Sequence, residues 1–314
     1  MQTALELKRA IELKVQSKPY NKARERKMTV YEEWCVTTGQ KAFPVTKDTV
    51  TGFLCQHVVN NNGSTRSVAT VKSMLKKGCE QRGYAWLSTL ENGSVLEHMR
   101  ELAKVDMSEG AQKRALQRES IQRIVDKGDL QDAMFLYICV LLETGHDGLL
   151  RSGEMLSGIK GTNILWKHDK KGFRMEVLWT KTGGSALIDY NDYGGMNAVT
   201  FMRRWFDQHG LWDKPEAHVF PAVTSAGRFD FTRTASLSWL RRRIKIAVAS
   251  IGLDPKKYSG HSLRAGGATD LFVARVPYYI IKKKGRWVSD SAMQYYRDEE
   301  DIQEEVSKAF ALWK

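Results

Sequence analysis

The sequence predicts a mainly α-helical protein of the α+β class, in which helices accompany one small antiparallel sheet. Three observations lead to this expectation. Apolar residues recur with the period of amphipathic helices along most of the chain. That period changes to strand-like alternation between residues 163 and 189. The length of 314 residues exceeds one ordinary domain and suits two hydrophobic cores.

The first predicted domain, residues 1–105, is a bundle of four or five short helices. The pattern is clearest at residues 67–82, where Val68, Val71, Leu75 and Cys79 form one apolar stripe. The segments expected to be helical are Lys22–Thr38, Thr46–Val58 and Ser67–Arg82. The basic side chains beside the apolar stripe are Arg66, Lys72 and Lys76. A solvated surface is the simplest explanation for such lysines.

Residues 106–116 lose the apolar period and become polar, so they are the predicted linker to a second domain at residues 117–314. The nearly all-apolar run Ala133–Leu142 predicts a buried core helix, because it is too short to cross a bilayer. The composition Thr182-Gly183-Gly184 is typical of a hairpin turn. The predicted strands are Asn163–Trp166, Phe173–Trp179 and Ser185–Asp189. The further predicted helices are Tyr193–Gln208, Thr234–Ile251, Ser262–Val273, Pro277–Lys284, Asp290–Tyr296 and Glu299–Leu312.

The charge balance points to an anionic partner. The chain carries 49 Lys and Arg against 36 Asp and Glu, a formal charge of +13. The commonest partner of such a basic protein is a phosphate backbone, although a merely soluble basic protein fits the charge as well. The four cysteines lie far apart, which predicts neither a zinc site nor a disulfide framework and favours a reducing compartment. No metal-binding or nucleotide-binding motif occurs, so no metal and no cofactor are expected.

Three short segments carry candidate chemistry. The segment Gly148–Leu156 (GLLRSGEML) places Glu154 three residues after Arg151. The segment Gly260–Asp270 (GHSLRAGGATD) places His261 and Arg264 three apart at the start of a predicted helix, so both can face one space. The segment Gly285–Asp298 (GRWVSDSAMQYYRD) follows. Each alone has an ordinary structural explanation, but the three together are harder to explain in that way.

These segments resemble the tyrosine recombinase, or phage integrase, family in its Cre-like variant with Trp at the second His/Trp position. The family carries an arginine with an acidic residue three later, a hairpin lysine, an H-x-x-R box, a His or Trp, and a tyrosine nine positions further. Here the matching residues, in the same order, are Arg151 with supporting Glu154, Lys181, His261, Arg264, Trp287 and Tyr296. The resemblance covers nearly the whole chain, and it implies a helical core-binding domain followed by a mixed catalytic domain.

The resemblance leaves the nucleophile open between two adjacent tyrosines. The nine-residue offset from Trp287 selects Tyr296, whereas a Y-x-R ending with Arg297 would begin at Tyr295. The offset is the firmer criterion, so Tyr296 is the predicted nucleophile.

The implied reaction transfers a DNA phosphodiester to tyrosine and needs these residue types. Its transition state gains negative charge on the non-bridging oxygens, which the forked guanidiniums of Arg151 and Arg264 match. A free tyrosine has a pKa of about 10, so nearby arginines and a proton acceptor at His261 are needed to activate it. Lys181 is the expected general acid for the 5′ oxygen. Trp287 either donates its indole N–H to the phosphate or only packs.

The remaining expectations concern partners. The predicted helix 234–251 carries Arg241, Arg242, Arg243 and Lys245 beside an apolar stripe. Its family counterpart lies in the major groove of double-stranded DNA. Residues 67–82 are expected to approach the duplex from the opposite face, with Arg66, Lys72 and Lys76 as DNA-binding residues. The C-terminal segment 298–314 resembles the family's oligomerisation helix, which implies a homo-oligomer, a tetramer when two sites are joined; packing on its own domain is equally consistent with the sequence. No membrane association is expected, and the expected location is the cytoplasm or nucleoid of a prokaryotic or phage setting, or a eukaryotic nucleus.

Three alternatives to a recombinase stay open. A type IB topoisomerase shares the nucleophile chemistry but relaxes supercoils as a monomer. A catalytically silent DNA-binding relic would have the same fold. An unrelated helical DNA-binding regulator would leave the six-residue series unexplained.

Overall fold

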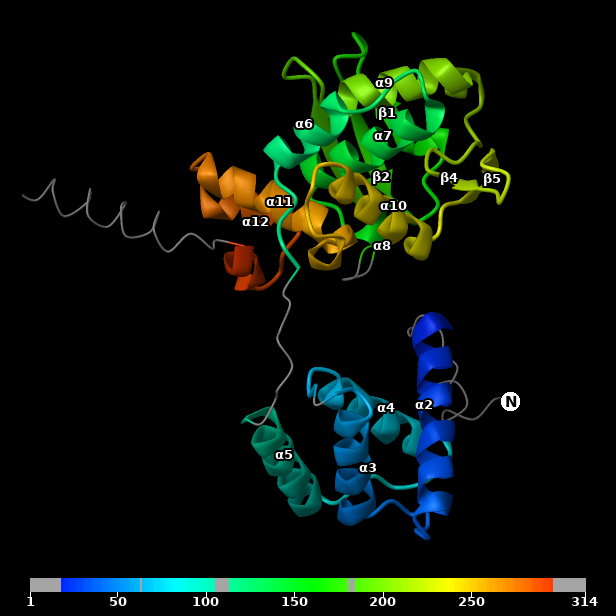
Figure 1. Ribbon diagram of the computed structural model, residues 1–314, viewed down its shortest axis with the longest axis vertical. Coiled ribbons are helices and arrows are strands. Elements are labelled where there is room, and N and C mark those ends of the chain that lie inside the picture. Colours follow the sequence, from blue (N-terminus) through cyan, green and yellow to red (C-terminus); the bar gives the residue numbers. More distant parts are fainter. Residues whose placement is uncertain (1–17, 63, 105–112, 179, 181–183, 296–314) are drawn as a thin grey trace, which may run out of the picture. The chain divides into compact units, whose positions relative to one another are not determined.

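The computed structural model describes residues 18–62, 64–104, 113–178, 180 and 184–295 (Figure 1). The chain forms two compact units, Met1–Gly110 and Ala111–Lys314. The last residues of the predicted linker belong to the second unit, because the backbone N–H groups of Arg114 and Leu116 donate to the carbonyls of Lys257 and Ser262. Among the described residues, no helix has the length and apolar character required to cross a membrane.

The first unit is a helical bundle around its own apolar core. Its helices are α2 (Lys18–Thr37), α3 (Lys47–Val59), α4 (Val68–Gln81) and α5 (Thr89–Lys104). The stripe predicted on α4 is buried, and it packs with Met28, Tyr31 and Phe53 of the two preceding helices. Helix α3 begins where Thr46 and Thr49 cap each other's backbone N–H groups. The three helices predicted for this domain are therefore present, with ends that differ by a few residues.

The second unit is built around the helix α7 (Ala133–Asp147), most of whose residues are buried, as the sequence predicts. Three helices pack against it: α6 (Arg118–Asp126), α9 (Ala198–His209) and α11 (Gly260–Val273). Helix α10 (Leu237–Ser250) contributes Leu240, Ile244 and Val248 to the same core. These helices lie around α7 (Figure 1) and enclose the main apolar core of this unit; a smaller apolar cluster includes Leu149, Ile281 and Trp287.

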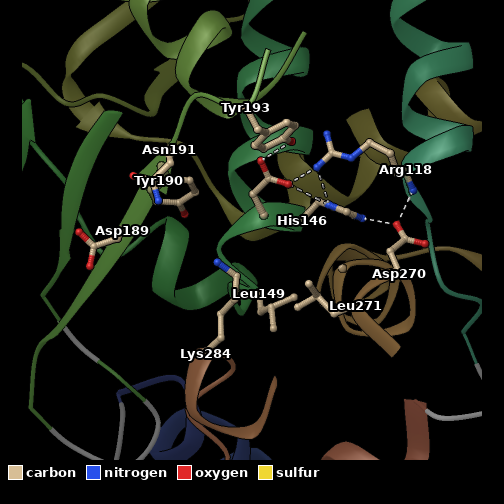
Figure 2. Close-up of a pocket in the computed structure, with 12 residues that line it drawn as sticks. Arg118, His146, Leu149, Asp189, Tyr190, Asn191, Tyr193, Asp270, Leu271 and Lys284 are labelled. Atoms are coloured by element: carbon tan, nitrogen blue, oxygen red, sulfur yellow. Dashed lines mark hydrogen bonds and ion pairs between the residues drawn. The ribbon is translucent and has the colours of Figure 1, made fainter. Parts of the chain in front are cut away.

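The C-terminal end of α7 carries a half-buried ionic cluster (Figure 2). Arg118 of α6 forms ion pairs with Glu143 and Asp147, and its backbone N–H donates to Asp270 of α11 at 2.6 Å. His146 contacts Asp147 at 3.2 Å and Asp270 at 2.8 Å. The cluster therefore joins α6, α7 and α11 through ion pairs and hydrogen bonds.

The ionisation of this cluster departs from that of free side chains. Burial lowers the pKa of His146, but the hydrogen bonds to Asp147 and Asp270 outweigh burial and raise it above its usual value. Burial raises the pKa of Glu143 to about 7, in spite of the opposing charge of Arg118. Both groups therefore hold their protons more tightly than free side chains do.

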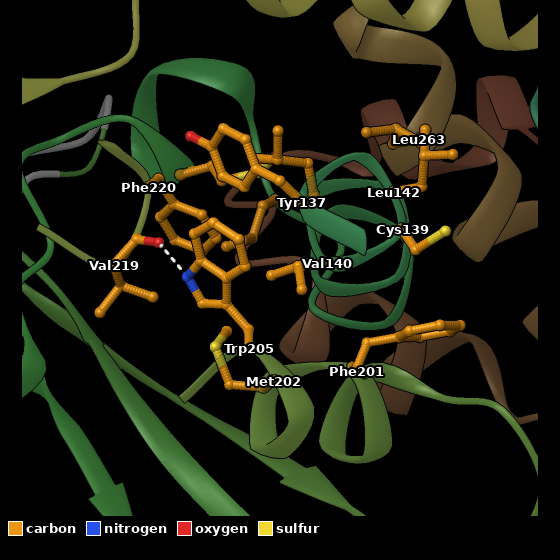
Figure 3. Close-up of a cluster of buried hydrophobic side chains, with 14 of the residues drawn as sticks. Tyr137, Cys139, Val140, Leu142, Phe201, Met202, Trp205, Val219, Phe220 and Leu263 are labelled. Atoms are coloured by element: carbon orange, nitrogen blue, oxygen red, sulfur yellow. Dashed lines mark hydrogen bonds between the residues drawn. The ribbon is translucent and has the colours of Figure 1, made fainter. Parts of the chain in front are cut away.

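The apolar part of α7 packs against α9 (Figure 3). Tyr137 stacks on Trp205 with ring centroids 4.9 Å apart, and the Trp205 indole N–H donates to the Val219 carbonyl at 3.0 Å. The buried donor of this large side chain is thereby satisfied. The predicted run Ala133–Leu142 is confirmed as a core helix.

The predicted three-stranded antiparallel sheet is present as β1 (Ile164–Trp166), β2 (Gly172–Val177) and β3 (Ala186–Asn191). Phe173 pairs with Tyr190 and Met175 with Ile188, which puts these side chains on the buried face. The connection from β2 to β3 includes residues 179 and 181–183, which lie outside the described residues.

Two predicted helix starts are wrong. The helix expected at 193–208 begins only at Ala198, because Gly194 and Gly195 have positive φ and the Asn197 side chain caps the N–H groups of Val199 and Thr200. The helix expected at 234–251 begins at Leu237, where Ser236 accepts from the Trp239 N–H. Thr234 instead ends a hairpin that the sequence analysis missed, β4 (Pro221–Val223) paired with β5 (Phe229–Thr234).

Helix α11 approaches its neighbours closely because of two glycines. A methyl group at Gly266 would lie 1.9 Å from the Leu116 carbonyl oxygen, and one at Gly267 would lie 2.3 Å from the His146 carbonyl oxygen.

After α11 come α12 (Tyr278–Lys284) and a 3₁₀ turn, Asp290–Tyr295, where a helix was expected. The helix predicted at 299–312 lies outside the described residues.

We expect Gly266→Ala to destabilise the second unit by about 1–3 kcal/mol, because the added methyl group would overlap backbone that cannot move aside. Urea unfolding followed by circular dichroism measures this loss. The matched control is Gly153→Ala, since Gly153 lies in a helix with no atom within 4 Å of the added methyl group. Equal stability of the two variants would contradict the close approach of α11.

We also expect the free energy of unfolding to fall as the pH rises, from about 4.3 through the folded pKa of about 7 for Glu143, and from about 6.5 upward for His146. A group with a raised folded-state pKa stabilises the fold below its unfolded pKa, about 4.3 for Glu and about 6.5 for His, and this contribution is lost as the pH passes the folded value. Glu143 and His146 both have raised pKa values, so their contributions have the same sign. Urea titrations across this range should show a smaller fall for His146→Gln. An identical pH dependence would rule out the assigned role of His146.

Candidate active site

The first part of the candidate site is the turn that leads into the short helix α8 (Ser152–Met155). Leu149 has a positive φ of 46°, and Arg151 is the N-cap residue of α8. The Glu154 carboxylate accepts from the Arg151 backbone N–H at 2.9 Å and from its guanidinium at 2.5 Å. The side chain of Arg151 stays 26% exposed. The predicted pairing of Arg151 with Glu154 is therefore present.

Glu154 is buried at 1% exposure and stays ionised. Burial by itself would raise its pKa, but the Arg151 backbone hydrogen bond and the charge of Arg286 hold the pKa below its ordinary value. This second cation, Arg286, lies 2.9 Å from the other carboxylate oxygen.

Helix α11 brings the H-x-x-R box against α8. Ser259 caps α11 by accepting from the backbone N–H of His261. A methyl group at Gly260 would lie 1.9 Å from the Ser152 hydroxyl oxygen, so the two helix starts are in close contact. His261 is exposed in the first turn of α11, whereas Arg264 is buried one turn later.

The guanidinium of Arg264 lies between the turn before α8 and the turn after α12. It donates to the carbonyls of Leu149 and Gly285, the latter at 2.5 Å. The Trp287 ring, 9% exposed, covers it at 3.9 Å. Trp287 therefore packs against Arg264.

Arg286 is a site residue that the sequence analysis missed. Its guanidinium donates to the carbonyls of Gly148, Leu149 and Lys284 and to Glu154. The only signal in the sequence was its place between Gly285 and Trp287, inside a segment already singled out. The Arg118 cluster at the end of α7 was missed as well, because its members are far apart along the chain.

The structure thus brings Arg151, His261, Arg264 and Trp287 together around the starts of α8 and α11. The other two predicted catalytic residues, Lys181 and Tyr296, lie outside the described residues. Tyr295 is the last residue of the 3₁₀ turn Asp290–Tyr295. The choice between the two tyrosines therefore stays a prediction.

A cavity of about 360 Å³ lies beside this site (Figure 2). Leu149 and Lys284 line it on the side of the candidate site, and Arg118, Asp147 and Asp270 line it on the side of the ionic cluster. Within the described part of the chain, no group of three or more His, Cys, Asp or Glu residues is arranged to hold a metal ion.

The predicted DNA-binding residues are mostly solvent-facing. The exposed ones are Arg66, Lys76, Arg241, Arg242 and Lys245. Lys72 and Arg243 are half-buried, and the Arg243 guanidinium lies 5.2 Å from the Trp239 ring. Their contact with DNA stays a prediction.

No protein-family model matches the sequence, and a search of curated proteins gives no match. Solved structures do match. The site-specific recombinase XerH, in a post-cleavage complex with palindromic difH substrate, is 13% identical with a TM-score of 0.59, over 84% of this chain and 72% of that chain. The Tn1549 transposon integrase, in complex with transposon right end DNA, is 15% identical with a TM-score of 0.59, over 96% of each chain. At this identity the similarity establishes the fold, so the chain has the fold of the tyrosine recombinases.

Proposed function

We propose that this protein is a site-specific DNA recombinase that cleaves and rejoins DNA through a covalent 3′-phosphotyrosine intermediate. The observation that carries the proposal is the convergence of Arg151, His261 and Arg264 on one site within a recombinase fold. The structural neighbours are DNA complexes of a recombinase and an integrase, which supports double-stranded DNA as the substrate here.

Arg151 is the best-placed phosphate ligand. One of its terminal nitrogens donates to Glu154, and the side chain remains 26% exposed, so part of the fork can face a non-bridging oxygen. The ion pair with Glu154 orients the fork before DNA arrives. Such preorganised donors stabilise the charge that develops in the transition state.

Arg264 and His261 complete the protein's part of the site. We assign Arg264 to the same phosphate; its guanidinium is buried, and its positive charge adds to the field at the site. His261, exposed one turn earlier, is assigned as the proton acceptor of the attacking tyrosine. Trp287 packs on Arg264 and keeps it in place.

The assignments of Tyr296 as nucleophile and of Lys181 as general acid rest on the sequence. The Tyr296 oxygen would form a bond to phosphorus while the bond from phosphorus to the 5′ oxygen breaks. His261 would take the phenolic proton, and Lys181 would protonate the leaving oxygen. Rejoining is the reverse reaction with a 5′ hydroxyl, so the energy of the phosphodiester bond is conserved in the phosphotyrosine link and no ATP is required.

DNA is held, in this proposal, by basic side chains of both units. Arg241, Arg242 and Lys245 lie on exposed positions of α10, and Arg66 and Lys76 on exposed positions at and in α4. Joining two DNA sites would take four protomers, with the segment 298–314 docking on a neighbour. Such binding should weaken steeply with salt.

The central prediction is a covalent protein–DNA adduct. Wild type is incubated with a pool of randomised DNA duplexes, the DNA that stays attached in denaturing detergent is sequenced, and a nicked duplex of the selected site then serves as suicide substrate. We expect the adduct to disappear with Tyr296→Phe and to persist with Tyr295→Phe. If the adduct disappears only with Tyr295→Phe, Tyr295 is the nucleophile. An adduct formed by the variant that lacks both tyrosines would refute attack by either of them. Supercoil relaxation without strand exchange would instead indicate a type IB topoisomerase.

We further expect Arg151→Lys to slow adduct formation by about two to three decades, because lysine keeps the charge but lacks the fork. The rate is measured in single turnover at saturating substrate. Arg174→Lys is the matched control, since Arg174 forms a half-exposed ion pair with Asp189 across two strands. Wild-type cleavage by Arg151→Lys would remove this arginine from the reaction.

A further inference from the structure

We propose that Arg286 is a positioning residue. It donates hydrogen bonds to the groups that orient the two candidate phosphate-binding arginines, Arg151 and Arg264. The inference rests on the proposed function and deepens it, because it names a residue that would orient the site without touching DNA.

The Arg286 guanidinium donates its hydrogen bonds to backbone carbonyls and one carboxylate of the protein itself. One terminal nitrogen donates to the Gly148 carbonyl at 3.2 Å and the Lys284 carbonyl at 2.8 Å. The other donates to the Leu149 carbonyl at 3.1 Å and to Glu154 at 2.9 Å. A guanidinium has four terminal N–H bonds, and these contacts use all four. Arg286 therefore has no terminal donor left for a phosphate.

Two of these acceptors are shared with the candidate phosphate ligands. Glu154 accepts from the Arg151 guanidinium on Oε1, and from Arg286 and the Arg151 backbone N–H on Oε2. The Leu149 carbonyl accepts from Arg264 and from Arg286. One side chain thus contacts the group that orients Arg151 and a group that orients Arg264.

The backbone at Arg286 adds a second, independent observation. Its φ is 58°, in the left-handed region that costs a non-glycine residue free energy and usually selects glycine. A glycine here would relieve this cost and lose the fork. Replacing Arg286 by glycine therefore removes the guanidinium without adding backbone strain.

Loss of the Arg286 guanidinium should slow DNA cleavage and leave the affinity for DNA unchanged. Without Arg286, the buried Glu154 keeps one cation, and the Leu149 carbonyl loses one of its donors. Both arginines would then sample orientations away from the phosphate. Small misplacements of reacting groups cost on the order of 100-fold in rate.

The test compares Arg286→Gly and Arg286→Lys with Arg275→Gly, a matched control because Arg275 also has a left-handed φ, of 57°, in the same unit. We expect the two Arg286 variants to cleave the suicide substrate about 100-fold more slowly at saturating DNA, with a dissociation constant and salt dependence like those of wild type. Arg275→Gly should cleave at the wild-type rate. Arg286→Lys keeps the positive charge, so it serves if Arg286→Gly does not fold.

Two results would overturn the proposal. Cleavage by the Arg286 variants at the rate of Arg275→Gly would show that no positioning is needed. A loss that appears as weaker, less salt-dependent DNA binding would mean that Arg286 contacts phosphate itself.

A double-mutant cycle separates this proposal from the proposed function. If Arg286 acts through Glu154, the effects of Arg286→Gly and Glu154→Gln on the urea midpoint and on the cleavage rate should not be additive. Additive effects on stability would overturn the bridge through Glu154. If wild type forms no adduct, the proposed recombinase activity fails, and the stability cycle still decides whether Arg286 is coupled to Glu154.

Discussion

The geometry of the candidate site depends on the ion pairs that compensate one buried carboxylate, that of Glu154. A carboxylate at 1% exposure is destabilising unless donors and cations surround it. Glu154 is compensated by Arg151 from its own turn and by Arg286 from the turn after α12. Both turns must therefore meet at this acid. The same meeting places the Leu149 and Gly285 carbonyls around Arg264, so the compensation of one acid organises both guanidiniums.

Close backbone approach makes this meeting possible. Gly260 lets the start of α11 touch α8, and Gly266 and Gly267 let the body of α11 lie against Leu116 and the end of α7. The ionic cluster of Arg118 and its partners joins the same helices on the far side of the cavity. Helix α11 is thus tied to its neighbours by packing and by charge. This rigid support suits a site whose chemistry depends on the orientation of arginines.

The elements that sequence reasoning located are those with a strong, local pattern. The all-apolar run of α7 and the alternation of β2 and β3 each specify burial without reference to distant residues. The errors have local causes that compete with the pattern. Asn197 and Ser236 cap their helices four and two residues after the predicted starts at 193 and 234. In the short hairpin β4–β5, Phe229 and Phe231 are partly buried although polar residues surround them in the sequence. Helix ends follow capping contacts more than apolar period.

The sequence by itself determined the fold class and the basic character and supplied the candidate chemistry-bearing residues, because residue type and spacing along one chain carry that information. It determined neither which groups support Arg151 and Arg264 nor which helices the Arg118 cluster joins. Arg286 is 132 positions from Glu154, and Asp270 is 124 positions from His146. No local period encodes such pairs. They arise only when packing excludes water from a charge and a distant residue of opposite charge must compensate it.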